Sequence, residues 1–430
     1  MNINYEGSKS YLNMVKDLEE VQKILKKYDQ EHLLYFFNKL DENEKNILIK
    51  QIKQTNFKRM DKLYTGSFKD DSIDSNRITP LPYFCSSKLS DAEKNKYITI
   101  GENIIKQGKV AVITLAGGQG TRLGFKGPKG CYELDLDEKK SLFEVIFDKL
   151  NTIYKKYGVY LNWYIMTSES NNKETKDFFE KKAYFGYPKE KIYFFKQDVI
   201  EILDKQGKVL LENLYSIKKA SNGNGDIFRA FKRAKLEKTL NNIEWISISG
   251  IDNIILEIID PLLIGLTISN NSNVSAKSIK KKDLDSKDYV FVKVDNRVDI
   301  ISPKNLRDEQ KYSKNEDGLY NYNQMNILSH LFSKKAFLQS SKLTLPYHRA
   351  FKKNDFIDES GMKVVVKEPN SFKFEKFIFD VFKYFNNFTL LEVEENEEFA
   401  PIKAFTGSYT PETALDLYCK KYNINRKEEE

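Results

Sequence analysis

Short β-rich runs alternate with helix-length stretches from about residue 100 onward, and this alternation constrains the fold more than any other feature of the chain. The β-rich runs are 110–115, 163–166, 192–195, 245–248 and 289–294. Stretches long enough for a helix lie between them, at 142–157, 173–182 and 227–240. Such alternation is typical of a mostly parallel sheet covered by helices. The sequence therefore predicts an α/β fold, in which ligands bind at the carboxyl ends of the strands.

The two ends of the chain have a different pattern from its middle. Residues 8–64 place apolar side chains at helical spacing and contain neither glycine nor proline, which predicts helices. We therefore expect a helical N-terminal domain over 1–100, a catalytic α/β domain over 101–385 and a small C-terminal domain over 386–430.

Four further segments lie outside this alternation. Residues 66–82 are rich in Ser, Asp and Asn, and this predicts a connecting loop. The polar stretches 269–287 and 302–318 are interpreted as surface excursions. The aromatic segment 372–385 is interpreted as an amphipathic helix.

Composition excludes several classes of protein. The 430 residues include 70 Lys and Arg against 62 Asp and Glu, a net charge of only +8, and the lysines are mixed with acidic residues, so we expect no nucleic-acid partner. The three widely spaced cysteines include no CxxC pair, which argues against a disulfide framework or a zinc site. The N-terminus lacks a signal-peptide pattern, and acidic residues and Pro261 interrupt the most apolar window, 251–268. We expect a cytoplasmic protein without a membrane anchor.

A glycine-rich loop directly follows the β-rich run 110–115. Gly117, Gly118 and Gly120 allow backbone amides to turn toward one anion without an obstructing Cβ. Arg122 and Lys129 add a planar guanidinium and a point charge, which suits a triphosphate. The spacing fits neither the dinucleotide fingerprint, because it is one residue too long, nor the P-loop, because no Gly-Lys-Ser/Thr ends it.

The loop also carries a family resemblance. The run LAGGQGTRLG at 115–124, followed by PKG at 128–130, resembles the signature of the eukaryotic-type UDP-sugar pyrophosphorylases, most closely the UDP-N-acetylglucosamine pyrophosphorylase family. Other segments resemble the family in the same order, over roughly residues 30–420: YIMTSES at 164–170, YFG at 184–186, FFKQ at 194–197, NGNGDIFRAF at 222–231, IDNIILEIIDP at 251–261, FKFEKFIFDVF at 372–382 and EEFAPIKA at 397–404.

The resemblance implies a Rossmann-like sheet of the nucleotidyltransferase type and a reaction of UTP with N-acetylglucosamine 1-phosphate that releases pyrophosphate. It places Leu115, Ala116, Gly117 and Gly118 against the uridine and phosphates. Gln197 in FFKQ is expected to bind uracil, because its amide offers both a donor and an acceptor to a pyrimidine edge.

The resemblance further assigns the Gly-Asn pair and the metal ligand. Gly223 is expected to let the backbone reach the base, and Asn224 to contact the sugar. Asp252 falls where related nucleotidyltransferases bind Mg²⁺, with Mn²⁺ as a possible substitute. A helix N-cap is the alternative role for Asp252.

Lysines complete the expected catalytic set. The resemblance implies that Lys373 and Lys403 face the phosphates and that Arg122, Lys129 and Lys403 are catalytic. No covalent nucleophile is needed, because positioning and charge neutralisation lower the barrier to in-line attack on the α-phosphorus.

The chain departs from the family pattern near the expected sugar pocket. Asn326 and His330 are retained, the former as a substrate-binding residue and the latter in a packed or hydrogen-bonded structural role. Four other positions differ, with Ser302 and Asn305 in place of glutamates and Gln324 and Met325 in place of Ala-Gly.

These departures leave two alternatives open. One is a pyrophosphorylase for glucose or galactose 1-phosphate, although such relatives usually carry His where this chain has Asn224. The other is a catalytically silent UTP-binding relative. The sequence leaves the oligomeric state, monomer or dimer, undecided.

Overall fold

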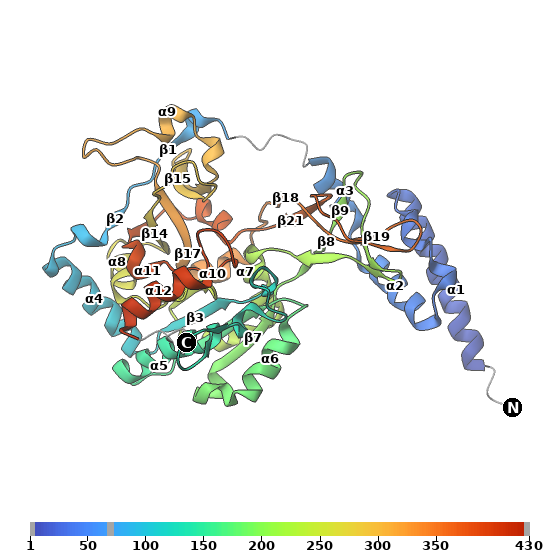
Figure 1. The fold of residues 1–430 in the computed structure, drawn as a ribbon, viewed down its shortest axis with the longest axis horizontal. Helices are drawn as coiled ribbons and strands as arrows, with labels where there is room; N and C mark the ends of the chain where they lie inside the picture. Colours follow the sequence, from blue (N-terminus) through green and yellow to red (C-terminus); the bar gives the residue numbers. More distant parts are fainter. Residues whose placement is uncertain (1–4, 67–72, 425–430) are drawn as a thin grey trace. The chain divides into compact units, whose positions relative to one another are not determined.

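The computed structural model describes residues 5–66 and 73–424, with side chains from residue 14 onward. The chain forms two compact units, each assembled from separate stretches (Figure 1). Unit 1 comprises Met1–Asp71, Val199–Gly223 and Pro346–Phe377, and unit 2 comprises Ser72–Asp198, Asn224–Leu345 and Ile378–Glu430. This division differs from the expected boundaries at 100 and 385, because two later segments join the N-terminal helices and the C-terminal residues belong to the larger unit.

Unit 2 is built on a sheet of eleven strands among the described residues. Its main path runs β2-β22-β14-β17-β13-β3-β6-β7, and only β17 is antiparallel to its neighbours on this path. The predicted mostly parallel α/β sheet is confirmed. The strands of the path are β2 (Phe84–Cys85), β3 (Val110–Leu115), β6 (Asn162–Thr167), β7 (Ile192–Lys196), β13 (Trp245–Gly250), β14 (Val274–Lys280), β17 (Gln324–Ser333) and β22 (Phe388–Glu392).

Three more strands extend this sheet through β15. They are β1 (Ile78–Pro80), β15 (Val290–Val294) and β16 (Arg297–Ile301), all paired antiparallel. The predicted loop 66–82 therefore ends in a strand. A separate two-stranded ribbon pairs β4 (Glu133–Leu134) with β5 (Lys140–Ser141).

Helices cover both faces of the sheet. Phe143 and Phe179, from α5 and α6, pack in one core with Trp163 of β6. Tyr164, the next residue along β6, contacts Phe231 of α7 on the opposite face. The helices of unit 2 are α4 (Asp91–Lys106), α5 (Leu142–Tyr157), α6 (Asn172–Lys181), α7 (Ile227–Arg233), α8 (Pro261–Ser269), α9 (Asp308–Lys311), α10 (Lys334–Ser340), α11 (Glu395–Glu398) and α12 (Pro411–Tyr422).

Local sequence explains where these helices begin and end. Ser141 and Glu144 form a capping box that starts α5, and Gly158, with φ of 70°, ends it in the left-handed conformation. The predicted helix over 227–240 is instead interrupted, because Lys235 takes a positive φ of 57° between α7 and a 3₁₀ turn over Leu236–Leu240.

Unit 1 combines three helices with short strands. Residues of α1 and α2, such as Val21, Leu25 and Ile49, share one core with Leu203 and Phe374 from the later segments. The helices are α1 (Tyr5–Lys27), α2 (Glu42–Gln54) and α3 (Phe57–Gly66), as the helical spacing predicted. The strands are β8 (Val199–Glu201), β9 (Leu203–Asp204), β10 (Leu211–Asn213), β11 (Ser216–Ile217), β12 (Lys219–Ser221), β18 (His348–Lys352), β19 (Phe356–Ile357), β20 (Lys363–Val364) and β21 (Ser371–Glu375).

Three predictions for individual segments are wrong. Residues 269–287 are not simply a surface excursion, because β14 lies inside the sheet with Lys277 fully buried. The segment 372–385 is not an amphipathic helix but most of strand β21 followed by a 3₁₀ turn over Ile378–Tyr384. Residues 386–430 do not form a separate domain, because β22 pairs with β14 and α12 contributes to the main core.

Helices long and apolar enough to cross a membrane are absent from the residues that the structure describes.

Candidate active site

The glycine-rich loop begins where β3 ends, at the carboxyl edge of the parallel strands. Leu115 is the last residue of β3, and the N–H of Ala116 still donates to Met166 of the neighbouring strand. Gly117 then passes so close to Gln197 that an added Cβ would lie 2.0 Å from the Gln197 Nε2 atom. The fold therefore brings four of the predicted nucleotide-binding residues together, and any side chain at 117 would displace the Gln197 amide.

A buried asparagine that the sequence analysis missed holds the loop. Asn171, fully buried after β6, donates from Nδ2 to the carbonyls of Ala116, at 2.9 Å, and Gly118, at 3.1 Å. Its Oδ1 accepts a hydrogen bond from the N–H of Ser168 at 2.8 Å. The only signal in the sequence was a polar residue just after a predicted strand.

The outer part of the loop presents open backbone and one free guanidinium. A Cβ at Gly118 would meet nothing within 4 Å, so this glycine faces open space. Arg122 lies in a 3₁₀ turn over Thr121–Leu123 and is exposed. Its guanidinium forms no ion pair with any side chain between residues 14 and 424 that the structure describes. The arginine is therefore available to an anion.

Lys129 and Asp252 form an ion pair beside the loop. Lys129 is 8% exposed, and its Nζ lies 3.2 Å from Asp252 Oδ2. Its backbone N–H donates to the Gly118 carbonyl at 3.0 Å, which ties the lysine to the glycine turn. Asp252 follows β13, the strand next to β3 in the sheet. Two predicted site residues of opposite charge thus meet at the carboxyl edge.

The residues on either side of Lys403 join its segment to this group through backbone hydrogen bonds. The N–H of Ile402 donates to the Asp252 carbonyl at 2.9 Å, and the N–H of Phe405 donates to the Arg122 carbonyl at 3.2 Å. The Lys403 ammonium lies 4.1 Å from the centre of the Tyr409 ring, a cation–π contact that holds the side chain without neutralising it.

The predicted Gly-Asn pair is divided between the two units. Gly223, in unit 1, has φ of 87°, and an added Cβ would lie 2.3 Å from the Lys376 carbonyl oxygen, so packing alone requires glycine there. Asn224, in unit 2, accepts a hydrogen bond through Oδ1 from the N–H of Ile378 at 2.9 Å. Lys373 belongs to β21 of unit 1, where its Nζ lies 2.9 Å from Glu375 Oε1. The roles of these three residues stay predictions.

Asn326 lies at an irregularity of β17. The pairing register of β14 and β17 shifts between Ala276 and Ser278, and Leu328 takes a positive φ of 56°. Asn326 Oδ1 accepts from the N–H of Leu328 at 3.1 Å and lies 3.2 Å from His330 Nε2. Burial lowers the pKa of His330 to about 3, so this histidine is neutral and suits the structural role expected of it.

Packing accounts for two of the four departures from the family pattern. Gln324 is buried, accepts from Ser278 Oγ at 2.7 Å and donates to Glu392 Oε2 at 2.6 Å. Met325 belongs to the main hydrophobic core. The other two, Ser302 and Asn305, flank and end a 3₁₀ turn over Pro303–Asn305 and are half-buried. Nothing in the structure explains the choice of those two residues.

Carboxylates at two places in unit 2 are candidates for a metal site, Asp252 alone and a cluster of three acidic residues. Asp252 fits a magnesium ligand, because glycine at 250 leaves space beside it: a Cβ there would lie 2.8 Å from Asp252 Oδ1. A lone carboxylate suits Mg²⁺, which takes its other ligands from phosphate and water. The carboxylates of Glu257, Asp260 and Glu398 also lie within 4.8 Å of one another, but the ammonium of Lys277 already contacts two of them at 2.8 Å. Lys277, Asp260 and Glu398 therefore form an ion-pair network around a buried ammonium, with the exposed Glu257 beside it.

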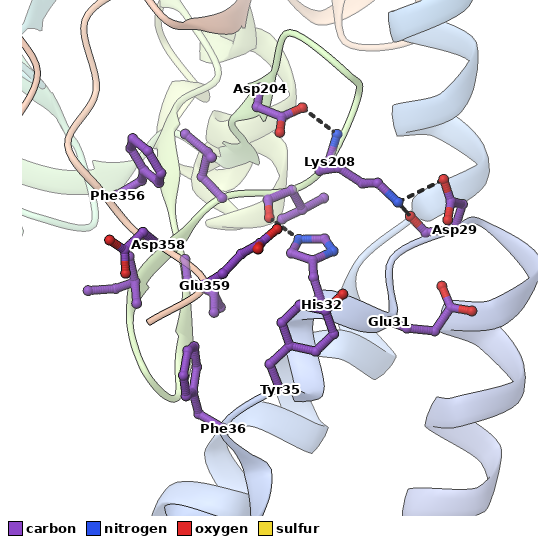
Figure 2. Close-up of a pocket in the computed structure, with 14 residues that line it drawn as sticks. Asp29, Glu31, His32, Tyr35, Phe36, Asp204, Lys208, Phe356, Asp358 and Glu359 are labelled. Carbon is purple, nitrogen blue, oxygen red and sulfur yellow. Dashed lines mark hydrogen bonds and ion pairs between the residues drawn. The ribbon is translucent and has the colours of Figure 1, made fainter. Parts of the chain in front are cut away.

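A cavity of about 520 Å³ lies wholly within unit 1 (Figure 2). Its wall carries five carboxylates, and its lysine, Lys208, is paired with Asp29 at 2.7 Å. His32 lies 2.7 Å from the Val209 carbonyl through Nε2, and burial lowers its pKa. Because excess negative charge repels phosphates, this cavity does not fit a nucleotide triphosphate.

Cys131 is not a candidate nucleophile, although it follows Lys129 in a 3₁₀ turn over Lys129–Cys131. Burial raises the pKa of its thiol to about 12, which leaves it protonated at neutral pH. All three cysteines are free.

A mostly parallel sheet whose carboxyl edge carries a glycine turn, a free arginine and a lysine–aspartate pair defines an α/β nucleotidyltransferase. Residues 54–426 match the family described as UTP–glucose-1-phosphate uridylyltransferase, and the chain belongs to this family. It is therefore an enzyme of the uridylyltransferase class.

Individual relatives agree with this assignment. The UDP-N-acetylglucosamine pyrophosphorylase of Saccharomyces cerevisiae is 34% identical over 370 residues, 83% of this chain and 77% of the relative. UDP-N-acetylglucosamine diphosphorylase 2 of Arabidopsis thaliana is 30% identical over 416 residues, 91% of this chain and 81% of the relative. The crystal structure of the uridine diphosphate N-acetylglucosamine pyrophosphorylase of Trypanosoma brucei superposes with a TM-score of 0.78 at 26% identity, covering 94% of this chain and 84% of that one.

Proposed function

We propose that this protein transfers the uridylyl group of UTP to N-acetylglucosamine 1-phosphate, forming UDP-N-acetylglucosamine and pyrophosphate. The observation that carries the proposal is the Lys129–Asp252 pair, 3.2 Å apart beside the turn that contains Gly118. A buried ammonium, a carboxylate and a glycine that faces open space at one sheet edge suit a triphosphate with its metal ion. The names of the relatives support the choice of sugar.

The nucleotide end of the site is formed by the loop and β7. Gln197 would bind the uracil edge through its amide, and Gly117 keeps the backbone close to it. The amides of Gly117 and Gly118 would face the phosphates, with Arg122 binding two phosphate oxygens and Lys129 a third. The chain thereby fixes the α-phosphorus before the second substrate reacts.

The chemical step needs charge stabilisation rather than a protein nucleophile. An anionic oxygen of the sugar phosphate attacks the α-phosphorus, and the bond from this phosphorus to the oxygen bridging to the β-phosphorus breaks. The electron pair leaves with pyrophosphate, so no proton donor is required. Lys403 would neutralise the incoming phosphate while Arg122 and Lys129 stabilise the leaving group.

Magnesium is the proposed cofactor, and Asp252 would hold it. The bound ion would supply positive charge to the phosphate oxygens and so favour departure of pyrophosphate. Lys129 would then move from its pair with Asp252 to a phosphate oxygen.

A pyrophosphate-release assay with a panel of sugar 1-phosphates tests the proposal. We expect kcat/KM for N-acetylglucosamine 1-phosphate to exceed that for glucose or galactose 1-phosphate by about tenfold or more. A tenfold preference for glucose 1-phosphate would identify a hexose pyrophosphorylase instead. A UTP-dependent rise in Tm without turnover of any sugar would identify a silent relative.

A further inference from the structure

Two segments far apart in the sequence carry proposed active-site residues and are joined side by side. The loop between β13 and α8 carries Asp252, and the segment 398–405 after α11 carries Lys403. The N–H of Ile254 donates to the Ala400 carbonyl at 3.2 Å, in addition to the bond from Ile402 to Asp252. These two backbone hydrogen bonds lie on either side of the antiparallel pairing of Asn253 with Pro401. Because the neighbouring residues supply both N–H groups, the pairing needs none from the proline.

The side chain of Asn253 strengthens this junction. Asn253 is 4% exposed, and its Nδ2 donates to the Glu398 carbonyl at 2.7 Å. Its Oδ1 accepts from the N–H of Ala400 at 2.9 Å. A carbonyl only accepts and an N–H only donates, so these two partners fix the orientation of the amide. The Asn253 side chain thus binds both Glu398 and Ala400, at the start of the segment that leads to Lys403.

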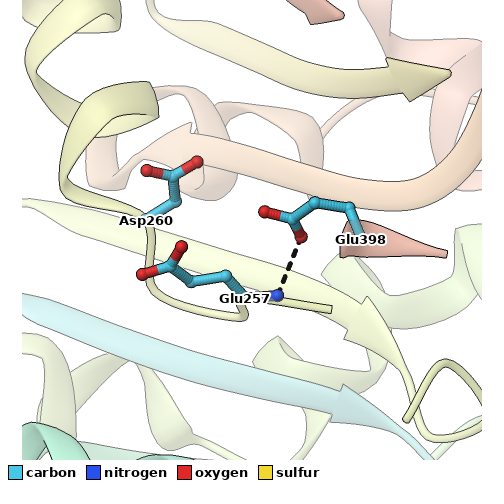
Figure 3. Close-up of side chains that lie close together, drawn as sticks. All are labelled: Glu257, Asp260 and Glu398. Atoms are coloured by element: carbon cyan, nitrogen blue, oxygen red, sulfur yellow. Dashed lines mark hydrogen bonds between the residues drawn. The ribbon is translucent and has the colours of Figure 1, made fainter. Parts of the chain in front are cut away.

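The carboxylate of Glu398 anchors the same junction in two ways. Its Oε2 accepts from the backbone N–H of Glu257 at 2.8 Å (Figure 3). Its Oε1 lies 2.8 Å from Lys277 Nζ, which ties the junction to the sheet. Lys277, fully buried on β14, also contacts Asp260 Oδ2 at 2.8 Å and the Glu257 carbonyl at 3.2 Å. The ammonium is therefore surrounded by acceptors from three residues, two in the loop before α8 and one at the end of α11.

From this geometry we infer that Asn253 and Glu398 are positioning residues that act through Lys403. They fix the distance between the backbone of Asp252 and that of Lys403, so that these two sides of the site are in place before substrates bind. The inference rests on the proposed function. Its physical basis is that a displacement of about 1 Å at a reacting centre can cost on the order of 100-fold in rate.

A double-mutant cycle between Asn253→Ala and Lys403→Ala tests this role in the full chain. We expect Asn253→Ala to lower kcat/KM about tenfold or more in the wild-type background and less than about threefold when Lys403 is already alanine, because coupled residues are not additive. Equal losses in both backgrounds would overturn the inference, because a merely structural residue would reduce activity independently of Lys403. The assays use the sugar 1-phosphate that the wild type turns over best.

Two further variants keep the test decisive. Ser272→Ala removes a buried hydrogen bond of 2.8 Å to Thr389 elsewhere in unit 2 and should leave kcat/KM within about twofold. Glu398→Gln removes the ion pair with Lys277 while an amide oxygen can still accept from Glu257, and it replaces Asn253→Ala in the cycle if the latter does not fold. If the wild-type protein turned over no sugar 1-phosphate, the proposed function would be refuted, and the inference that rests on it would fall as well.

Discussion

Individual residues of the loop are determined by contacts that only the folded chain provides. Any side chain at 117 would displace the Gln197 amide, because Gln197 Nε2 would lie 2.0 Å from a Cβ at that position. Lys129 is almost fully buried, and burying its charge is tolerable because Asp252 lies 3.2 Å away. Arg122, by contrast, is exposed and has no such partner. The arginine is thus the charge in the loop that is held ready for substrate.

Arg122 gives the prediction at the residue scale. Arg122→Ala should lower kcat/KM for UTP by about 100-fold or more, the effect of removing one preorganised charge stabiliser. Steady-state kinetics with UTP as the varied substrate measures the loss.

Lys126→Ala is the matched control for this prediction. Lys126 is an exposed cation in the same loop and should contribute less than about threefold through general electrostatic attraction. Equal losses in the two variants would show that Arg122 acts only through net charge and not as a specific ligand.

The sequence predicted the residues whose chemistry is local and missed those whose partners are distant. The glycine turn, Arg122 and Lys129 follow one another within a few positions, so a shared role in binding phosphates could be predicted from the sequence. Asn171 and Asn253 bind backbone atoms of segments that are 53 and 147 positions away. The sequence around a single asparagine does not indicate which distant backbone atoms its side chain will bind in the folded protein.

At the scale of elements, α4 and α8 pack with their backbones in direct contact. An added Cβ at Gly265 of α8 would lie 1.8 Å from the Tyr97 carbonyl oxygen, and one at Gly101 of α4 would lie 2.0 Å from the Pro261 carbonyl oxygen. Because both obstacles are backbone atoms, no change of rotamer can relieve the overlap. The helix pair therefore depends on glycine at each position.

Gly265→Val should lower the free energy of unfolding by about 3 kcal/mol, the upper range for overpacking a core. Urea unfolding followed by circular dichroism measures the loss. Gly66→Ala, where an added Cβ meets nothing within 4 Å, should be close to neutral. A stable Gly265→Val protein would mean that the two helices do not approach as closely as the structure shows.

Elements with a regular apolar pattern were predicted well, and those with buried polar residues were not. The helix predicted over 142–157 coincides with α5, whose capping box and terminal glycine are visible in the sequence. β14 was missed because its pattern includes Lys277, whose burial depends on carboxylates from Asp260 and Glu398. The segment 372–385 was misassigned because closely spaced aromatics fit a helix as well as a strand followed by a turn.

At the scale of the whole molecule, the sequence predicted the class of fold but not the division of the chain. Unit 1 takes in residues 199–223 and 346–377 in addition to the N-terminal helices. These insertions contribute Leu203 and Phe374 to the core of unit 1, which no local pattern could indicate. The predicted boundaries at 100 and 385 failed because they assumed that each domain is continuous in sequence.

We expect the glycine turn between β3 and Lys129 to bind the triphosphate of a uridine nucleotide. A crystal structure of the full chain with UTP bound would reveal where the nucleotide lies. We predict phosphate density beside Gly118 and Arg122, with the uracil against Gln197. Nucleotide density elsewhere, for example in the acidic cavity of unit 1, would contradict the account.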